Sequence, residues 1–345
     1  MTPGTMQFLD ALTEFERAVQ DEDISAMEEA HAGLSSAYGD ATRDELAQGG
    51  PRLADLLDDV PLGGRSNIAV LIGACVEQGA DAVACGFAVV RNVAENLSNA
   101  KIFAETWRET LAEALGDELP DPDGEVIREL FEVFGPEITL SWWELDNWMR
   151  AGVAVLQHPQ VRGALNQEQR DYLIEQLDAL HETADRWDKC LAYLLVVLDD
   201  EPLVVLHRES ATGYRVRTTG IGDNFQLDTL LGNALIGAGH IPGDPPSAEA
   251  VAACLDTEGM VPSEGIFLFH ALDGSRVWYE GNPSDIPVVD GHRVLVLDPR
   301  PFPHHFPAGR FSPRMPASLD VEDVLSEQEV AAWFERAKPL EAAVE

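Results

Sequence analysis

The spacing of apolar residues changes once along this chain, at Pro202, and this change constrains the fold more than any other feature. Before Pro202, apolar side chains recur every three or four residues, as they do on one face of an α-helix. After Pro202, short apolar runs and strict alternation predict β-strands. The sequence therefore predicts a two-domain α+β protein, with an all-helical domain over residues 1–200 and an α+β domain over residues 201–345.

Four segments of the first half carry the helical pattern. Residues 8–19 draw one amphipathic face, and Pro51 is placed as at the entrance of a short helix. Residues 65–97 are apolar nearly all round, which predicts a buried helix or a helical hairpin broken near Gly79 or Gly86. Residues 173–198 predict one long helix, with a kink near His181 as an option.

Short helices joined by glycine and proline turns resemble a HEAT- or armadillo-like stack in their architecture alone. No clean repeat of the length typical of that class is visible in the sequence. An irregular helical bundle therefore remains the alternative for the all-helical half.

The second half predicts five strands and three helices. Residues 203–207 form an apolar run, and residues 213–219 alternate between apolar and charged side chains. Residues 266–271 and 276–280 flank Asp273-Gly274, a dipeptide typical of a type I′ hairpin turn, and residues 293–297 are the fifth strand. Helices are expected over residues 224–236, 247–255 and 326–337. Hairpin links between strands predict a mostly antiparallel sheet.

The charge and the termini indicate a compartment and exclude some partners. A formal net charge of -38 disfavours binding to duplex nucleic acid or to an anionic membrane. The N-terminal segment lacks the pattern of a signal peptide, which predicts a cytoplasmic protein. The four cysteines form no CxxC pair, so neither a zinc site nor a disulfide framework is indicated.

A first candidate site lies on the predicted strands at the start of the second half. Arg215 and Arg217 share one strand face, and His207 and Arg208 lie on the preceding strand. If these strands pair, the four side chains would converge on one side of the sheet, where guanidinium groups bind a carboxylate or phosphate. The alternative is a solvated outer face of the sheet, which strand alternation alone requires.

A second candidate site is the proline-rich loop over residues 297–316, which gathers five cationic or titratable side chains: Arg300, His304, His305, Arg310 and Arg314. Adjacent histidines on an extended chain point in opposite directions, so no metal site is predicted there. We expect this interaction loop to dock on the acidic helical half, in the same chain or in a second copy.

No catalytic motif identifies a reaction, so the catalytic residues are unknown, no cofactor is predicted and enzymatic activity is disfavoured. The leading interpretation is a non-enzymatic cytoplasmic scaffold that recognises a protein partner. The alternative is a binding protein or enzyme for a small anionic ligand, using the Arg/His face of the sheet. A third hypothesis, an acidic antagonist of a basic protein, depends on net charge alone.

Overall fold

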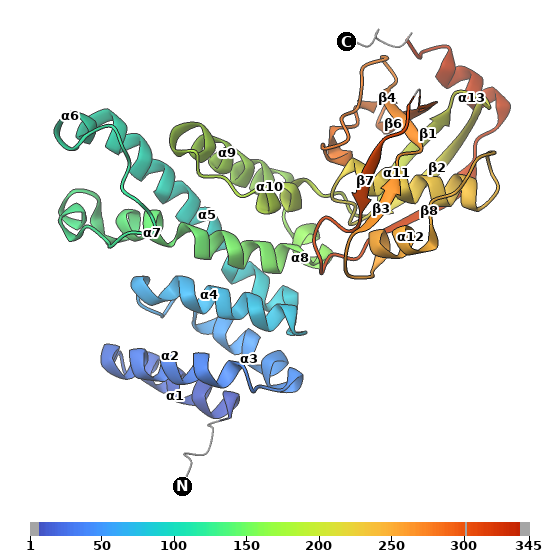
Figure 1. The fold of residues 1–345 in the computed structure, drawn as a ribbon. Helices are drawn as coiled ribbons and strands as arrows, with labels where there is room; N and C mark the ends of the chain where they lie inside the picture. The colour runs from blue at the N-terminus through green and yellow to red at the C-terminus, as the bar shows by residue number, and fades with distance from the viewer. Residues whose placement is uncertain (1–6, 301, 339–345) are drawn as a thin grey trace. The chain divides into compact units, whose positions relative to one another are not determined.

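The computed structural model describes residues 7–300 and 302–338 of the chain (Figure 1). The fold is α+β, with many helices and a mixed six-stranded sheet. The chain divides into two compact units, Met1–Leu195 and Val196–Glu345, which we call the helical unit and the sheet unit. Among the described residues, no helix has both the length and the apolar content needed to traverse a bilayer.

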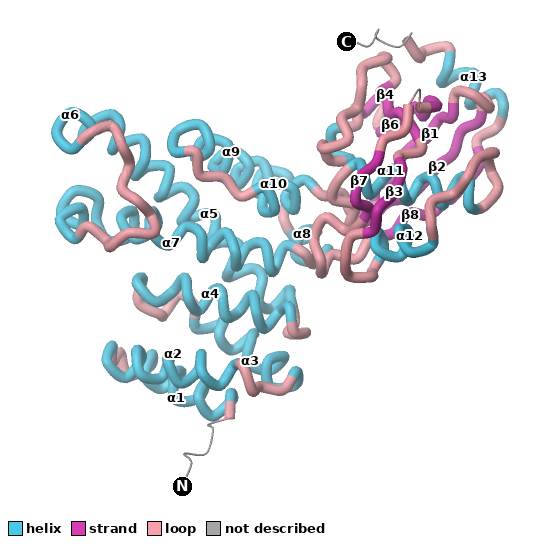
Figure 2. The backbone as a smooth tube through the Cα atoms, viewed as in Figure 1, coloured by secondary structure: helices cyan, strands magenta, loops and turns pink. Residues whose placement is uncertain are grey.

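The described part of the helical unit is built from helices joined by loops (Figure 2). Its elements are α1 (Phe8–Gln20), α2 (Ile24–Tyr38), α3 (Arg43–Leu56), α4 (Leu62–Glu77), α5 (Ala82–Thr106), η1 (Trp107–Leu111), α6 (Ala112–Leu115), η2 (Arg128–Leu130), α7 (Phe131–Leu156), α8 (Pro159–Ala164), α9 (Gln167–Ala184) and α10 (Lys189–Val196).

Two helical predictions are confirmed. Phe8, Leu12 and Phe15 on α1 are buried, as the amphipathic spacing requires. The apolar segment forms the hairpin α4–α5, which breaks at Gly79 with a φ of 110°. The next helix then starts at Asp81, whose side chain accepts hydrogen bonds from the first backbone N–H groups of α5.

The prediction that Pro51 begins a helix is wrong. Helix α3 begins at Arg43, because Thr42 and Glu45 form a reciprocal capping box that satisfies the free N–H groups there. Pro51 lies inside α3, next to Gly50. A Cβ at Gly50 would lie 2.7 Å from the Cβ of Ala80, so the absence of a side chain allows the close approach.

The prediction of one helix over residues 173–198 is also wrong. Helix α9 ends at Ala184 because Asp185 adopts the left-handed conformation, with a φ of 52°. Helix α10 starts again at Lys189, and the Asp188 carboxylate accepts a hydrogen bond from the N–H of Leu191. The apolar rhythm continues across this break, which is why spacing alone missed it.

The sheet unit contains one main sheet and one two-stranded ribbon. Its elements are β1 (Glu201–His207), β2 (Thr212–Thr219), α11 (Asn224–Gly232), η3 (Asn233–Gly237), α12 (Ala248–Leu255), β3 (Val261–Glu264), β4 (Phe267–Ala271), η4 (Pro283–Asp285), β5 (Val288–Val289), β6 (His292–Pro299), β7 (His305–Ala308), β8 (Ser318–Val324) and α13 (Glu327–Phe334).

Strand order in the main sheet is β4-β6-β1-β2-β8, with β5 paired to β6, while β3 pairs with β7 in the ribbon. Strands β1 and β6 are parallel, and the other named pairings are antiparallel. The carboxyl ends of β1 and β6 therefore lie together, at His207 and Leu297. Such an edge is where open α/β sheets commonly bind ligands.

The core packs on both faces of the main sheet. Leu203 and Val205 of β1 join the larger core with α11, η3 and α12, whereas Val204 and Leu206 join the smaller core beside α13. Burial on both faces explains why β1 reads as a continuous apolar run. On β2 the predicted alternation is confirmed, since Tyr214 is buried.

The predicted strand over residues 276–280 does not form. Arg276 makes an isolated bridge to His270, and the N–H of Val277 donates to the carbonyl of Phe269 at 3.0 Å, but residues 277–280 form no strand. Of the two turn residues only Gly274 has a positive φ, whereas a type I′ turn needs positive φ at both. The Asp273 carboxylate accepts hydrogen bonds from the backbone and hydroxyl of Ser275, which favours a different tight turn.

Candidate functional site

The helical unit contains a groove bounded by α3, α5 and α9, with a volume of about 780 Å³. We call it the α5–α9 groove. Its lining includes Asp55, Phe87, Ala88, Arg91, Glu168 and Tyr172. Phe87 is 52% exposed and Tyr172 is 42% exposed, so two aromatic side chains present much of their surface to solvent there. Exposed aromatics beside a concave apolar surface are typical of binding sites.

Small residues of α5 also line the groove. Ala84 and Ala88 lie one helical turn apart on α5 and line the groove. On another side of α5, Gly86 allows Val161 of α8 to pack closely, since a Cβ there would lie 2.9 Å from the Val161 methyl groups. Alanine on one face therefore leaves space, while glycine on another face brings α8 against α5.

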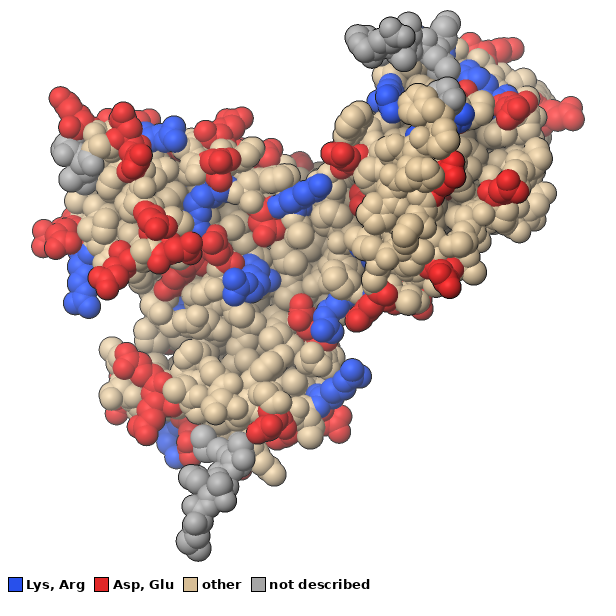
Figure 3. Space-filling view, viewed as in Figure 1, with Lys and Arg blue, Asp and Glu red and all other residues tan. Residues whose placement is uncertain are grey.

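The groove carries an excess of negative charge. Asp55 and Glu168 are exposed, and neither makes an ion pair or side-chain hydrogen bond with another described residue. The guanidinium of Arg91 is paired with Asp58, which also accepts a hydrogen bond from Asn92 at 3.0 Å. Figure 3 shows acidic side chains spread over the visible face of the same unit. The groove therefore presents two unpaired carboxylates and one neutralised arginine.

Of the four predicted residues of the Arg/His face, His207 does not share the side of the other three. Opposite partners in the antiparallel pair β1–β2 share a face, and Arg215 lies opposite Val204, on the α13 side. Arg217 has the same parity and shares that side. His207 has the parity of Val205 and lies on the opposite side of the sheet, with the larger core. The expected convergence is therefore wrong for His207, whereas Arg208 contacts Phe334 of α13 and lies on the same side as Arg215 and Arg217.

Both strand arginines are already paired with carboxylates. Arg215 donates hydrogen bonds to Glu329 at 2.9 Å and to Asp323 at 3.3 Å. Arg217 donates to Glu322 at 2.5 Å and to Asp200 at 3.1 Å. An anionic ligand would have to displace these carboxylates, so the pairing favours the alternative of a solvated outer face. Anion binding by these residues stays a prediction.

Arg208 belongs to a separate buried cluster at the end of β1. Its Nε donates to Asp298 at 2.8 Å, and Nδ1 of His270 lies 3.0 Å from the other Asp298 oxygen. Burial raises the pKa of Asp298, but the hydrogen bonds from His270 and Arg208 outweigh it and hold the pKa below its ordinary value. The Nη2 of Arg208 is buried and makes no hydrogen bond in the described structure. This cluster stabilises the sheet end from the α13 side.

Residues of the interaction loop contact other segments of the sheet unit. The guanidinium of Arg300 lies 4.3 Å from the ring centre of Tyr279, and His304 stacks on Phe225 at 6.1 Å. Residues 305–308 form β7, where His305 pairs with Glu264 of β3 in register. The remaining two arginines differ, because Arg310 is buried with an unbonded Nε and Arg314 is exposed. Docking of this loop on acidic helices stays a prediction.

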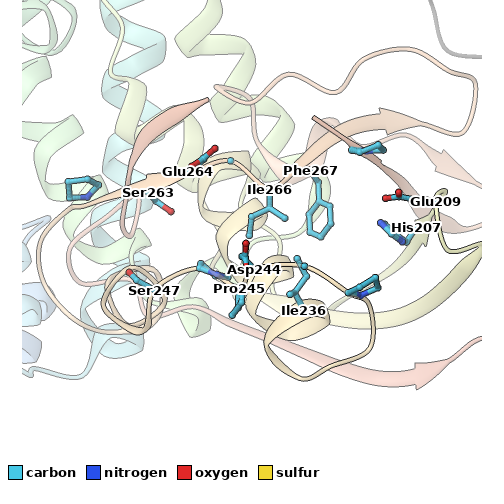
Figure 4. A pocket seen from close by; sticks show the side chains of 16 residues that line it. His207, Glu209, Ile236, Asp244, Pro245, Ser247, Ser263, Glu264, Ile266 and Phe267 are labelled. Atoms are coloured by element: carbon cyan, nitrogen blue, oxygen red, sulfur yellow. The ribbon is translucent and has the colours of Figure 1, made fainter. Parts of the chain in front are cut away.

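The sheet unit has a pocket of about 520 Å³ at the carboxyl ends of β1 and β6, which we call the β1–β6 pocket (Figure 4). Its lining includes His207, Glu209, Asp244, Glu264, Ile266 and Phe267. Figure 4 shows His207 and Glu209 together at one end, Glu264 toward the other end, and Asp244 between them. Of the sequence-based candidates, His207 alone lines this pocket.

Sequence reasoning missed most residues of both hollows. Phe87 was missed because a helix that is apolar nearly all round predicts burial, whereas Phe87 is 52% exposed. The pocket carboxylates Glu209, Asp244 and Glu264 come from three separate segments, and no local spacing connects them.

The remaining groups that could act at a site are metal ligands and cysteine thiols. Among residues 7–300 and 302–338, no three His, Cys, Asp or Glu side chains are placed to hold one metal ion. Burial raises the pKa of the Cys75 and Cys254 thiols to about 12, so both are protonated at neutral pH.

No protein-family model, curated protein or solved structure matches the chain.

Proposed function

We propose that this protein is a non-enzymatic cytoplasmic scaffold whose α5–α9 groove binds a basic amphipathic helix of a partner protein. The observation that carries the proposal is the groove itself, with two exposed aromatics and two unpaired carboxylates. In this proposal the helical unit is a HEAT- or armadillo-like support, and the sheet unit contributes further contacts to the same partner.

The apolar part of the groove supplies the affinity. An amphipathic helix inserts apolar side chains at spacings of three and four into such a groove. Phe87 would lose most of its remaining contact with water on binding, and aromatic anchors of this kind are typical hot spots, worth about 2 kcal/mol or more when truncated. That free energy corresponds to a roughly thirtyfold change in the dissociation constant.

The charge of the groove supplies the orientation and selects the partner. Asp55 lies on α3 and Glu168 on α9, so they flank the hollow from two helices. Lysine or arginine side chains beside the apolar stripe of a partner helix would pair with these carboxylates. Such exposed pairs add little affinity but speed association, so the association rate should fall as salt rises.

Two observations support a binding role over a catalytic one. The buried thiols of Cys75 and Cys254 are held protonated, which removes them as nucleophiles. The strand arginines Arg215 and Arg217 have their charges taken up by carboxylates of the sheet unit.

Site-specific photo-crosslinking tests the proposal in cells that produce the protein. The photoreactive residue p-benzoylphenylalanine replaces Tyr172 in one full-length variant, and Val133 in the control. Val133 is an exposed apolar residue on α7 outside the groove. We expect a crosslink to one defined segment from position 172 and not from position 133.

The crosslinked segment is then synthesised and its direct binding to the purified chain is measured. Support requires that the peptide is amphipathic and basic, and that it binds the wild-type chain. A segment that fails to bind on its own contradicts the proposal, as does catalytic turnover in a chain for which no partner is found.

A further inference from the structure

The β1–β6 pocket combines a buried imidazole with three carboxylates that form no ion pair or side-chain hydrogen bond within the described part of the chain. His207 is 5% exposed, yet it lines the pocket. Glu209, Asp244 and Glu264 are exposed on the pocket rim, and none forms an ion pair or side-chain hydrogen bond with another described residue. A hollow of this size is ordinary for a small-molecule site.

Hydrogen bonds fix which nitrogen of His207 is available to a ligand. The backbone N–H of Ser210 donates to Nδ1 at 3.4 Å, and the Ser210 hydroxyl lies 2.6 Å from the same nitrogen. Nδ1 therefore accepts, and the proton of the neutral ring resides on Nε2. Burial lowers the pKa of His207, against the opposing effects of Glu209 and Asp298, so the ring is neutral at neutral pH.

Nε2 has no hydrogen-bond partner among the described residues and is left to donate to whatever occupies the pocket. The Ser210 hydroxyl contacts Thr212 at 2.7 Å, and Thr212 accepts from Tyr214 at 3.1 Å, so a chain of hydroxyl groups holds the ring in place. A complementary ligand must therefore offer a hydrogen-bond acceptor near His207.

The rest of the pocket selects a cation with a compact body. Glu209 lies beside His207, while Asp244 and Glu264 lie further along the hollow, so negative charge extends over its length (Figure 4). Between them, Ile266, Phe267 and several prolines form rigid apolar walls. The lining residues include no lysine or arginine that would compete for the carboxylates.

We propose that the β1–β6 pocket binds a small organic cation that carries both ammonium and hydroxyl groups, with the chemistry of an amino sugar. Its ammonium groups pair with Glu209, Asp244 and Glu264, and one of its hydroxyl oxygens accepts a hydrogen bond from Nε2 of His207. This site is in the sheet unit and is separate in function from the α5–α9 groove.

The test uses neamine, a two-ring amino sugar, with the full-length protein at low salt in isothermal titration calorimetry. Three control ligands separate the two chemical features: per-N-acetylated neamine has no charge, maltose has hydroxyls without amines, and spermidine has amines without hydroxyls. We expect saturable one-to-one binding of neamine, weaker binding of spermidine, and none of the two neutral sugars.

Variants locate the binding and use a matched control. Glu209→Gln and Glu264→Gln should each weaken neamine binding about fivefold, which is the upper effect of one exposed ion pair. Glu258→Gln should change nothing, because Glu258 is an exposed carboxylate of the same unit outside the pocket. His207→Asn should weaken neamine binding and leave spermidine binding unchanged.

Three results would overturn the proposal: no saturable heat at millimolar neamine, an equal loss in Glu258→Gln and Glu209→Gln, or equal binding of neamine and its acetylated form. If His207→Asn has a clearly lower melting temperature than the wild type, NMR of the imidazole nitrogens in the wild-type protein is used instead of the variant. Neamine, but not spermidine, should shift the Nε2 resonance of His207, and a spectrum unchanged by neamine would refute the assigned hydrogen bond.

Discussion

Asp228 on α11 is a fully buried carboxyl group, and replacing it by asparagine should change how stability depends on pH. Its two oxygens accept hydrogen bonds from the N–H groups of Ile266 and Phe267, at 2.9 and 3.0 Å. Burial raises the pKa of Asp228 to about 7, although these two bonds and the charge of Arg300 act in the opposite direction.

The sign follows from proton binding. Between about pH 4 and pH 7 the unfolded chain has released this proton while the folded chain retains it, so the contribution of Asp228 to stability falls as pH rises. A shift from 3.8 to about 7, at about 1.4 kcal/mol per unit, sets an upper limit of about 4 kcal/mol. Above the folded pKa the loss is complete and the contribution stays constant.

Urea unfolding of the wild-type protein and Asp228→Asn, at a series of pH values from about 4 to 8, measures this difference. Comparing the two proteins at each pH removes the titration of all other groups. We expect the wild type to lose stability relative to the variant as pH rises. Parallel curves would refute the raised pKa, and a relative gain by the wild type would show that the hydrogen bonds and Arg300 outweigh burial.

Three further substitutions test other parts of the structure. Gly50→Ala places a methyl group 2.7 Å from the Cβ of Ala80 and should cost about 1–3 kcal/mol by overpacking, measured by urea unfolding; an unchanged midpoint would contradict the close contact. Glu144→Gln removes a carboxyl group whose pKa burial raises to about 7. The stability of the variant relative to the wild type should therefore rise by up to about 3 kcal/mol between about pH 5 and 8, measured by urea unfolding. A stability difference that stays constant over this range would exclude the raised pKa. Asp81→Ala removes the N-cap of α5 and should cost about 1 kcal/mol in thermal unfolding, whereas Asp81→Asn should restore most of it.

Periodicity predicted the elements whose burial is decided within one segment. The buried face of α1 and the alternation of β2 could be predicted from spacing alone. Apolar residues three or four apart share one side of a helix, and apolar residues two apart share one side of a strand. The break at Gly79 was readable because glycine tolerates positive φ.

Elements governed by local polar chemistry were misread. The capping box at Thr42 outweighs Pro51 as the start of α3, and the left-handed Asp185 divides an otherwise unbroken apolar rhythm. Both residue patterns are present in the sequence. Each is compatible with more than one local structure, and tertiary packing determines which of them forms.

The candidate sites needed tertiary information. Arg215 and His207 fall on opposite sides of the sheet because of the register between β1 and β2, which spacing does not determine. The acidic partners of Arg215 come from β8 and α13, more than a hundred positions along the chain. The α5–α9 groove likewise depends on how α9 packs against α5.

The dissociation constant of the crosslinked partner segment, measured by titration calorimetry, tests the central claim most directly. The comparison is between the wild-type chain, Phe87→Ser in the groove, and Val133→Ser outside it. We predict a roughly thirtyfold higher dissociation constant for Phe87→Ser and an unchanged one for Val133→Ser. Equal affinity of Phe87→Ser and the wild type would contradict the assignment of the groove as the partner site.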